Sequence, residues 1–283
     1  MKYIFQTWKR SDLEGANPIF QLSQNSWKHF HPSWEYEFFD DNALENSVRS
    51  AAPIFYKKYF KKHNGQIKKV DLFRYVNLFQ RGGVYSDLDG ECIQSFESTI
   101  LETREDHLIG ALKNETSPNR YPNALMISKN PLGNFWIYVL AHSIKRFEND
   151  RGYYSTEYLT GPMLLTEAIV MYQKSTLKEI LYFINRYFPD QLVYNTERKE
   201  TINLLSYKQV YPIDWHSHSA EIRKKIGSNR ISTGKIPFEL IYPETVYINY
   251  WTYSWTKPFT PLSQKIFLRF RYYYFRLRRF IKY

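Results

Sequence analysis

The stretch from residue 71 to residue 89, DLFRYVNLFQRGGVYSDLD, constrains the fold of this chain more than any other. Its first half has helical periodicity, and two glycines follow that can take the left-handed conformation in which many helices end. A short apolar segment then runs into Asp87 and Asp89. The stretch therefore predicts a helix, a glycine turn and a strand that ends in two carboxylates. The apolar residues expected to bury one face of the helix are Leu72, Tyr75, Val76 and Phe79.

The charged residues of this stretch form two pairs. Asp71 and Arg74 are three residues apart, so a helix places them on one face. Side chains two residues apart in extended backbone point the same way, so Asp87 and Asp89 are expected to converge on one point. Two converging carboxylates supply the hard oxygen ligands that Mg²⁺ or Mn²⁺ prefers, and such a site suits a diphosphate. The alternatives are a solvated turn for the two aspartates and a surface salt bridge for Asp71 and Arg74.

Strand and helix patterns alternate along the rest of the chain. This alternation predicts an α/β fold with a mainly parallel central sheet flanked by helices, in a single domain. Ligands of such sheets bind beyond the carboxyl ends of the strands, where Trp8 and Asp89 would both emerge. Strands are expected at 3–6, 34–39, 84–86, 107–112 and 124–128, and further helices at 17–30, 41–49, 53–63, 135–147 and 162–172.

Composition excludes several classes of protein. With 43% hydrophobic and 18% aromatic residues, 283 residues are enough for one well-packed domain, which argues against disorder. Cys92 is the only cysteine, so an intrachain disulfide is impossible and a reducing compartment is expected, with Cys92 as a small packing residue. We find no apolar run long enough for a signal peptide or a membrane-spanning helix. The sequence therefore predicts a cytoplasmic protein.

The positive charge is concentrated at the C-terminal end. Of the net charge of +11, residues 257–283 supply +8 and contain no Asp or Glu. An apolar stripe runs through this tail at helical spacing, which is typical of a helix that lies on an anionic membrane surface. Docking onto the rest of the protein and nucleic-acid binding are the alternatives, and no nucleic-acid module is present elsewhere. The stripe consists of Ile266, Phe270, Tyr273, Leu277 and Ile281.

Four motifs occur in an order that resembles a known family. Ile4-Phe5-Gln6-Thr7-Trp8 is similar to its opening I-x-Q-x-W strand, and residues 71–89 are similar to its D-x-x-R-Y, Gly-Gly and Y-x-D-x-D elements. Thr160-Gly161-Pro162 resembles its T-G-P turn, and residues 249–255 resemble its closing H-H-W-x-x-S-W segment. The family is that of glycosyltransferases with a sugar-binding region containing a DXD motif. It includes Golgi α-mannosyltransferases, α-galactosyltransferases and bacterial capsule enzymes.

The resemblance implies a nucleotide-diphospho-sugar transferase fold of the GT-A type over residues 1–257. The charge and apolar stripe of the tail predict that residues 258–283 are a basic aromatic helix for membrane attachment. The resemblance also implies that Asp71 and Arg74 hold the donor sugar, that Asp87 contacts the ribose or the ion, and that Asp89 is the first metal ligand. Trp8 would stack on the base, and the alternative is a core tryptophan. Tyr85 would contact the nucleotide or fill the core. The other residues expected to line the donor site are Gln6, Thr7, Leu88, Gly161, Ser254, Trp255 and Lys257.

The closing motif departs from the family pattern. Asn249 and Tyr250 stand where the family usually has two histidines. An asparagine oxygen can still bind Mn²⁺ or Mg²⁺, so Asn249 is the expected third metal ligand, with Ser254 as an alternative. His216 and His218 are expected to be loop residues or part of an acceptor pocket rather than a metal pair.

Together these features predict a metal-dependent, retaining hexosyltransferase. The expected donor is a UDP- or GDP-linked sugar, and the expected acceptor is a glycan or lipid-linked saccharide of polysaccharide, capsule or O-antigen type. The expected location is the inner face of the membrane, with an anionic membrane surface as partner and no nucleic acid. A toxin-like enzyme that glycosylates proteins and a non-catalytic protein that binds nucleotide sugars are the alternatives.

Overall fold

The computed structural model describes residues 2–150, 152, 154–215, 220–236 and 241–252. Contacts divide the chain into two compact units, Met1–Trp251 and Thr252–Tyr283. The fold described below is that of the first unit. The predicted C-terminal helix, the predicted ligands Ser254, Trp255 and Lys257, and His216 and His218 lie outside the described residues.

Six strands of the described residues form one sheet, in the order β2-β1-β3-β6-β5-β7. The pairs β1–β2, β1–β3 and β5–β7 are parallel, and β6 is antiparallel to both of its neighbours. The prediction of an α/β fold with a mainly parallel sheet is confirmed. The strands are β1 Tyr3–Thr7, β2 Glu35–Phe39, β3 Gly83–Ser86, β5 His107–Gly110, β6 Leu125–Ser128 and β7 Ile202–Leu205. A separate antiparallel ribbon joins β4 Gly90–Cys92 to β8 Tyr247–Asn249.

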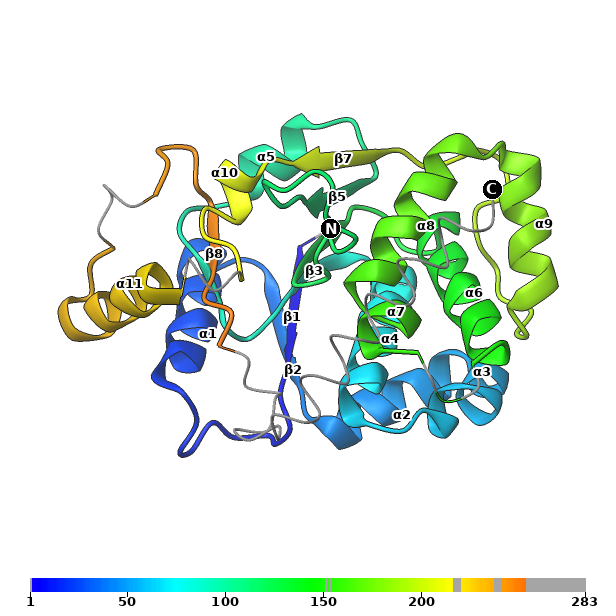
Figure 1. The fold of residues 1–283 in the computed structure, drawn as a ribbon, viewed down its shortest axis with the longest axis horizontal. Helices are drawn as coiled ribbons and strands as arrows, with labels where there is room; N and C mark the ends of the chain where they lie inside the picture. The colour runs from blue at the N-terminus through cyan, green and yellow to red at the C-terminus, as the bar shows by residue number, and fades with distance from the viewer. Residues whose placement is uncertain (1, 151, 153, 216–219, 237–240, 253–283) are drawn as a thin grey trace. The chain divides into compact units, whose positions relative to one another are not determined.

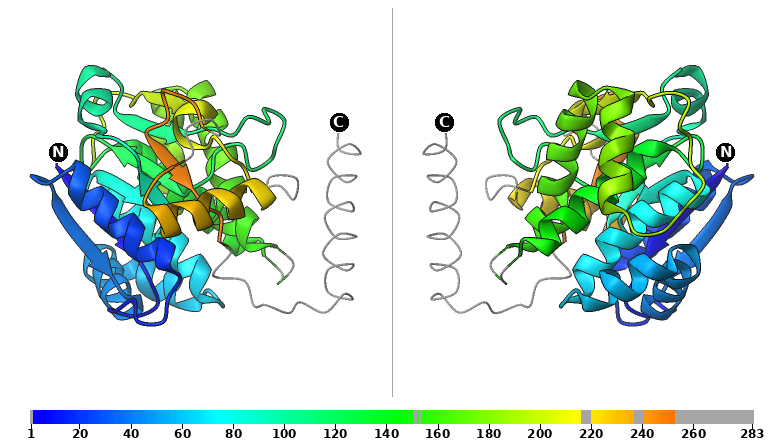
Figure 2. Two further views of the ribbon diagram at one scale, coloured as in Figure 1. Left: turned by 90° about the vertical axis from the view of Figure 1, so that its left-hand side faces the viewer. Right: turned by 90° about the vertical axis from the view of Figure 1, so that its right-hand side faces the viewer.

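Helices cover both faces of the sheet. Figure 1 shows α4, α6, α8 and α9 on one side of the strands, and α1, β8 and α11 on the other. The two views of Figure 2 face these two sides in turn. The longer helices are α1 Pro18–Phe30, α2 Asp41–Ala51, α4 Gln66–Arg81, α6 Asn134–Glu148, α8 Pro162–Lys174, α9 Leu177–Tyr187 and α11 Ala220–Thr233. The shorter ones are α3 Pro53–Lys58, η1 Phe60–Lys62, α5 Glu97–Glu102, α7 Thr156–Leu159 and α10 Tyr207–Val210.

The alternation of side chains along the strands builds one core on each face. Phe5 of β1 and Tyr85 of β3 pack with α4 and α6 in the larger core. Their neighbours Ile4 and Val84 point to the opposite face, where they pack with Trp27 of α1. Apolar side chains thus leave both faces of the sheet, as expected for strands buried between two layers. Cys92 is fully buried in the second core, which confirms its expected packing role.

The start of α1 and the end of α4 lie where capping residues in the sequence predict them. Asn17 caps α1 by accepting a hydrogen bond from Ile19 N at 3.0 Å, and Pro18 occupies the first helical position. At the end of α4, Gly82 has φ of +67° and Gly83 has φ of +99°. A Cβ on Gly83 would lie 2.6 Å from the ring of Tyr3, so both backbone conformation and space require glycine there.

One alternative considered for α4 is wrong. Beside the buried apolar stripe, a solvated face carrying Asp71 and Arg74 was the alternative to a sugar-binding role for this pair. Every residue from Asp71 to Phe79 is buried. The helix lies between the sheet and α6, and the segment around Thr160 covers its polar face.

No helix among the described residues is long and apolar enough to cross a membrane.

Candidate functional site

The candidate site lies where β1 and β3 end side by side. These two strands are parallel, with Phe5 opposite Tyr85, so the residues after Thr7 and after Ser86 leave the sheet at one edge. Trp8 follows the first strand and Asp87 follows the second. This confirms that the opening motif and the DXD motif meet at the carboxyl ends of the strands.

Gln6 holds the start of the DXD segment. The amide nitrogen of Gln6 donates to the backbone oxygen of Asp87 at 3.1 Å and to Ser23 Oγ at 2.9 Å. Its amide oxygen accepts a hydrogen bond from the Tyr36 hydroxyl at 2.8 Å. Gln6 is fully buried, so it fixes the position of Asp87 from behind. The role of Gln6 in contacting a donor stays a prediction.

The two aspartates of the DXD motif lie on a turn rather than on extended backbone. The strand ends at Ser86, and Gly90 N donates to the oxygen of Asp87 at 3.0 Å, which closes a four-residue turn. The premise that both side chains point the same way because the backbone is extended is therefore wrong. Both carboxylates are nevertheless only partly buried. Both also lie near the Tyr247 hydroxyl, whose pKa is raised by burial and further by Tyr211, Asp87 and Asp89.

Arg74 lies between Asp71 and Asp87, so it connects the Asp71–Arg74 pair with the DXD motif. Its Nη2 lies 3.1 Å from Asp87 Oδ1, and its Nη1 lies 3.6 Å from Asp71 Oδ1. Nη1 also donates to the backbone oxygen of Asn123 at 2.7 Å, and the guanidinium carbon lies 4.6 Å from the centre of the Tyr85 ring. The side chains of Asp71 and Arg74 are only 5% and 6% exposed. The alternative of a surface salt bridge on a solvated helix is therefore wrong.

Asp71 is enclosed by hydrogen-bond donors. Asn123 Nδ2 donates to its Oδ1 at 2.8 Å, and Thr160 Oγ1 donates to its Oδ2 at 2.9 Å. Burial raises the pKa of Asp71 to about 6, although Arg74, Thr160 and Asn123 all favour the charged form. For Arg74, burial opposes the charge, but Asp87, Tyr85 and Asp71 outweigh it and raise the pKa. The arginine is therefore a permanent cation between two carboxylates.

Tyr85 and Leu88 belong to the supporting layer of the site. The Tyr85 ring is 1% exposed, and its hydroxyl donates to Asp87 Oδ1 at 2.6 Å. Thr7, also buried, forms a side-chain hydrogen bond with the same hydroxyl. Leu88 is 5% exposed. Of the two roles considered for Tyr85, the structure favours the core, from which its hydroxyl holds Asp87.

The ribbon of β4 and β8 brings the closing motif next to the DXD turn. Asn249 pairs with Gly90, and Tyr250 N donates to the backbone oxygen of Asp89 at 2.9 Å. Asn249 is fully buried, and its Oδ1 accepts a hydrogen bond from Trp251 N at 2.8 Å. A Cβ on Gly90 would overlap the Tyr247 hydroxyl at 1.8 Å, so only glycine allows this close approach.

Glu91 anchors this ribbon to α11. Its Oε1 accepts a hydrogen bond from Arg230 Nε at 2.8 Å, and its Oε2 accepts one from the Tyr250 hydroxyl at 2.6 Å. The carboxylate is completely buried, and burial raises its pKa while Tyr250 and Arg230 oppose the rise. The ion pair thus fixes the strand that follows the DXD turn.

Two further predicted site residues differ in burial: Trp8 is partly exposed and Gly161 is buried. Trp8 is half-buried, with its ring centre 4.6 Å from that of Phe20, so it is not a core tryptophan. Gly161 is packed so closely that a Cβ would lie 3.4 Å from Asp71 Oδ2. The contacts of these residues with a nucleotide or a sugar stay predictions.

A divalent cation fits the chemistry of the DXD turn. Tyr85 and Arg74 both contact Oδ1 of Asp87, and in the described structure Oδ2 accepts no hydrogen bond. No group of three or more His, Cys, Asp or Glu side chains in this part of the chain is arranged to hold a metal. Mg²⁺ commonly uses one or two carboxylates and takes its other ligands from phosphate and water, so two aspartates are sufficient.

Sequence reasoning missed the shell around Asp71. Thr160 was noted only as part of a turn motif, although that motif was the available signal for its position. Asn123 contacts Asp71, Arg74 and Tyr75. It precedes β6 without any pattern that marks it. Ser23 and Tyr36, which hold Gln6, were also missed because a hydroxyl on an ordinary helix or strand carries no signal.

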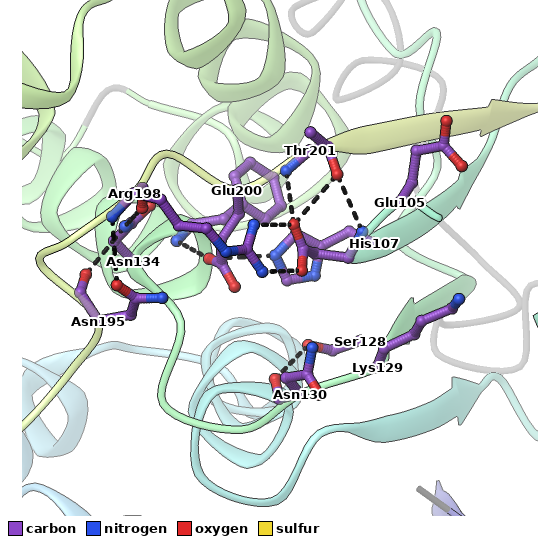
Figure 3. Close-up of polar contacts among 12 residues, drawn as sticks. Glu105, His107, Ser128, Lys129, Asn130, Asn134, Asn195, Arg198, Glu200 and Thr201 are labelled. Atoms are coloured by element: carbon purple, nitrogen blue, oxygen red, sulfur yellow. Dashed lines mark hydrogen bonds and ion pairs between the residues drawn. The ribbon is translucent and has the colours of Figure 1, made fainter. Parts of the chain in front are cut away.

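A second polar cluster lies at the opposite edge of the sheet. Asp106 accepts hydrogen bonds from Arg198 Nη1 at 2.7 Å and from Thr201 N at 2.9 Å, and His107 Nε2 lies 3.2 Å from Glu200 Oε2 (Figure 3). His107 pairs with Ser128, and Ser128 pairs with the first residue of β3, so the cluster and the DXD turn are at different ends of the strands.

The cluster ties the segment before β7 to the rest of the fold. Glu200 accepts a hydrogen bond from Phe135 N at 2.8 Å in the first turn of α6, where a negative charge is favourable. Burial alone would raise the pKa of Asp106, but Arg198 and Thr201 outweigh it and hold the pKa well below its usual value. We assign the cluster a structural role.

Comparison with known proteins gives a consistent result. Residues 19–106 match the family model described as the glycosyltransferase sugar-binding region containing a DXD motif. The chain is 33% identical over 99 residues to inositol phosphoceramide mannosyltransferase 2 of Schizosaccharomyces pombe, an alignment that covers 35% of this chain and 28% of the relative. It is 34% identical over 101 residues to the initiation-specific alpha-1,6-mannosyltransferase of Saccharomyces cerevisiae, covering 34% and 21%.

Two other similarities extend further along the chain. Inositol phosphoceramide mannosyltransferase 3 of Schizosaccharomyces pombe is 26% identical over 167 residues, which covers 58% of this chain and 43% of the relative. The matched regions thus span less than half the length of each of these curated relatives. Among solved structures, the PaToxG glycosyltransferase superposes with a TM-score of 0.46 at 15% identity, covering 70% of this chain and 79% of that one.

Proposed function

We propose that this chain, whose residues 19–106 match the glycosyltransferase sugar-binding region with a DXD motif, is a metal-dependent glycosyltransferase. It would move a hexosyl group from a nucleotide-diphosphate sugar to a glycan or lipid-linked saccharide. The observation that carries this proposal is the buried Asp71–Arg74–Asp87 chain, which ends at a turn with two partly exposed carboxylates. The mannosyltransferase relatives make mannose the first donor sugar to test.

Each of the three charged side chains, and Tyr85 beside them, has a defined role in this proposal. Arg74 and Tyr85 hold Asp87 through one oxygen, which leaves the other oriented for a ligand. The Nε–H of Arg74 is buried and has no acceptor among the described residues, so in this structure the guanidinium acts on Asp87 through Nη2. A bound Mn²⁺ or Mg²⁺ would neutralise the charge of the departing diphosphate. Asp89 and Asp87 are the residues that would hold it, and Asn249, which is fully buried with its Oδ1 bonded to Trp251 N, stays a predicted third ligand.

The remaining details follow from the family resemblance. We expect the transfer to retain the anomeric configuration by front-face displacement, with UDP or GDP as the leaving group. We also propose that the protein works at the inner face of a membrane, in the synthesis of a polysaccharide or glycolipid. The enrichment of Lys and Arg in residues 257–283 supports this location.

The first experiment is a panel of nucleotide sugars tested for hydrolysis in the presence and absence of Mn²⁺. Asp89→Ala should abolish hydrolysis while the melting temperature stays close to that of the native chain, because Asp89 is partly exposed. Glu197→Ala, which removes an exposed carboxylate outside the site, is the matched control and should keep full activity. Full activity of Asp89→Ala, or of the native chain in excess chelator, would exclude the metal-dependent mechanism.

The same panel separates the alternatives. A non-catalytic binding protein, the reading encouraged by Asn249 in place of a histidine, would bind a nucleotide sugar with Mn²⁺ but release no sugar. A toxin-like enzyme would hydrolyse the donor and transfer the sugar to protein in a mixture that also offers glycan acceptors.

A further inference from the structure

Four exposed lysines lie on α3 and η1: Lys57, Lys58, Lys61 and Lys62. Ile54, Lys57 and Lys58 share one face of α3 by their spacing i, i+3 and i+4, and Lys62 of η1 lines the same hollow as they do. We call these five residues and Pro53 the lysine face. Phe55 and Phe60 point the other way into the larger core, so the orientation of this face is fixed by packing.

The lysine face is not neutralised by neighbouring acids. Residues 46–70 contain seven Lys or Arg and no Asp or Glu, and none of the four exposed lysines forms an ion pair within the described residues. Three carboxylates contact the residues around the face, and none of them is paired with these lysines. Glu45 binds Lys69 and the Tyr56 hydroxyl, Glu148 accepts from the Tyr59 hydroxyl, and Asp190 accepts from the backbone of Ile54 and Phe55.

The centre of the face is aliphatic. Ile54 is 42% exposed and stands beside Pro53. Pro53, Ile54, Lys57, Lys58 and Lys62 line an open hollow of about 550 Å³. The hydroxyls of the neighbouring Tyr56 and Tyr59 are bonded to Glu45 and Glu148. The face itself consists of lysine ammonium groups around an aliphatic patch and includes no aromatic ring or arginine, the groups typical of nucleic-acid sites.

We propose that the lysine face binds the surface of an anionic lipid bilayer. Lysines attract anionic headgroups, and an exposed isoleucine at their centre can insert among the acyl chains. Figure 1 shows α3 beside α2, and η1 leads directly into α4, which carries Asp71 and Arg74. The amino end of α4 is at the same edge of the sheet as the DXD turn, since α4 and β3 are joined by the turn at Gly82 at the other end.

This placement has a consequence that rests on the proposed function. A bilayer held by the lysine face would lie at the edge of the sheet where the donor site opens. A lipid-linked acceptor could then reach the site without leaving the membrane. The binding surface itself does not depend on the activity, and vesicle binding and donor hydrolysis are measured separately.

The first test locates the contact. Cys92 is completely buried, so Ile54→Cys introduces one accessible thiol for an environment-sensitive dye. We expect the dye at position 54 to shift to the blue when phosphatidylglycerol vesicles are added to the full chain, and not with phosphatidylcholine vesicles. A dye on Val193→Cys, where the native side chain is 83% exposed, should not respond. A chain that binds the vesicles without a change at position 54 would overturn the proposal, and so would a chain that does not bind them.

The second test uses charge reversal in the full chain. Changing Lys57, Lys58, Lys61 and Lys62 to Glu should weaken binding to phosphatidylglycerol vesicles at least tenfold and leave donor hydrolysis without vesicles unchanged. The matched control reverses the exposed Lys174, Lys178, Lys224 and Lys225, which gives the same net charge. An equal loss of binding in both variants would show a general charge effect and overturn the proposal. Loss of single-stranded DNA binding in the first variant, with vesicle binding retained, would also overturn it.

Discussion

Asp71 is a carboxylate whose oxygens both accept hydrogen bonds inside the protein. Asn123 donates to one and Thr160 to the other, while Arg74 stands 3.6 Å away. Asp71→Asn keeps the shape of the side chain but turns one acceptor into a donor that faces another donor. We expect the free energy of unfolding to fall by about 1–3 kcal/mol, because a buried polar group loses its partner. Donor turnover should fall with it, since Arg74 loses one of its two neighbouring carboxylates. Urea denaturation and donor hydrolysis measure the two effects.

A second variant separates the charge of Asp71 from its hydrogen bonds. Thr160→Val removes one donor and leaves the ion pair with Arg74, so it should cost about 1 kcal/mol and retain much of the turnover. If Asp71→Asn were as stable and as active as the native protein, the charged contact between Asp71 and Arg74 would have neither a structural nor a functional role.

Individual residues also show where sequence reasoning reaches its limit. Spacing placed Asp71 and Arg74 on one face of a helix, and that part is confirmed. Spacing could not tell that the face is buried, because the covering residues Asn123 and Thr160 are far away in sequence. The sequence could not predict the orientation of Asp89 either, because it also depends on residues far away in the sequence. A turn closed by the N–H of Gly90 follows the strand, and its geometry depends on the later strand β8.

At the scale of elements, α6 contains a buried histidine that links stability to pH. His142 is 3% exposed and stacks on Phe183 of α9 with ring centres 4.2 Å apart. An unfolded chain protonates histidine near pH 6.5. In the folded chain burial, followed by Arg146 and Lys145, lowers the pKa of His142 to about 3. The unfolded state therefore binds more protons below pH 6.5, so the stability contribution is complete above that pH and is lost as pH falls towards 3.

We expect His142→Leu to flatten the pH dependence of stability between about pH 4.5 and 6.5, where each pH unit costs up to about 1.4 kcal/mol for one such group. Urea denaturation at several pH values measures the slope. Some slope should remain, because burial, followed by Lys68, also lowers the pKa of His63, to about 4. His29→Leu, at an exposed position, is the control. An unchanged slope in His142→Leu would show that His142 does not set the acid sensitivity.

Elements differ in how well the sequence reveals them. Local signals predicted four elements correctly: β1, α1, β2 and α4. Here apolar periodicity, Asn17-Pro18 and the Gly-Gly turn favour the same structure that the whole fold requires. α9 was not assigned, although Thr176 and Glu179 form a capping box that marks its start. β4 and β8 have three residues each, which is too short for any periodicity to be visible. Their pairing is nevertheless what brings the closing motif to the DXD turn.

At the scale of the whole molecule, charge is distributed in a few separate regions. Residues 257–283 carry +8 of the net +11, which leaves +3 for the rest. Residues 46–70 carry +7, so everything else before residue 257 carries −4. The candidate site lies at the ends of β1 and β3, and the cluster of Asp106 and Arg198 lies at the other end of the strands. The rule that ligands of such sheets bind beyond the carboxyl ends of the strands predicted the first location, whereas no local pattern indicated the second.

Removal of residues 258–283 tests whether the tail and the donor site act separately. Asp71, Asp87 and Asp89 all lie in the unit Met1–Trp251, so the truncated chain should remain folded and should still hydrolyse the donor. Seven Lys or Arg are lost with the tail. Each basic residue near an anionic surface contributes about 1 kcal/mol, and the attraction is screened over about 8 Å at physiological salt. Binding to phosphatidylglycerol vesicles should therefore weaken strongly, and the binding of the intact chain should fall as salt rises.

The truncated chain should nevertheless retain weak binding through the lysine face. Two linked surfaces that touch one bilayer bind more tightly than either alone, because the second contact forms at a high effective concentration. Reversing the charges of the lysine face in the truncated chain should then abolish vesicle binding. A truncated chain that unfolds, together with an intact chain that ignores anionic vesicles, would instead make residues 258–283 part of the fold. Vesicle co-sedimentation, with circular dichroism to monitor folding, distinguishes the two outcomes.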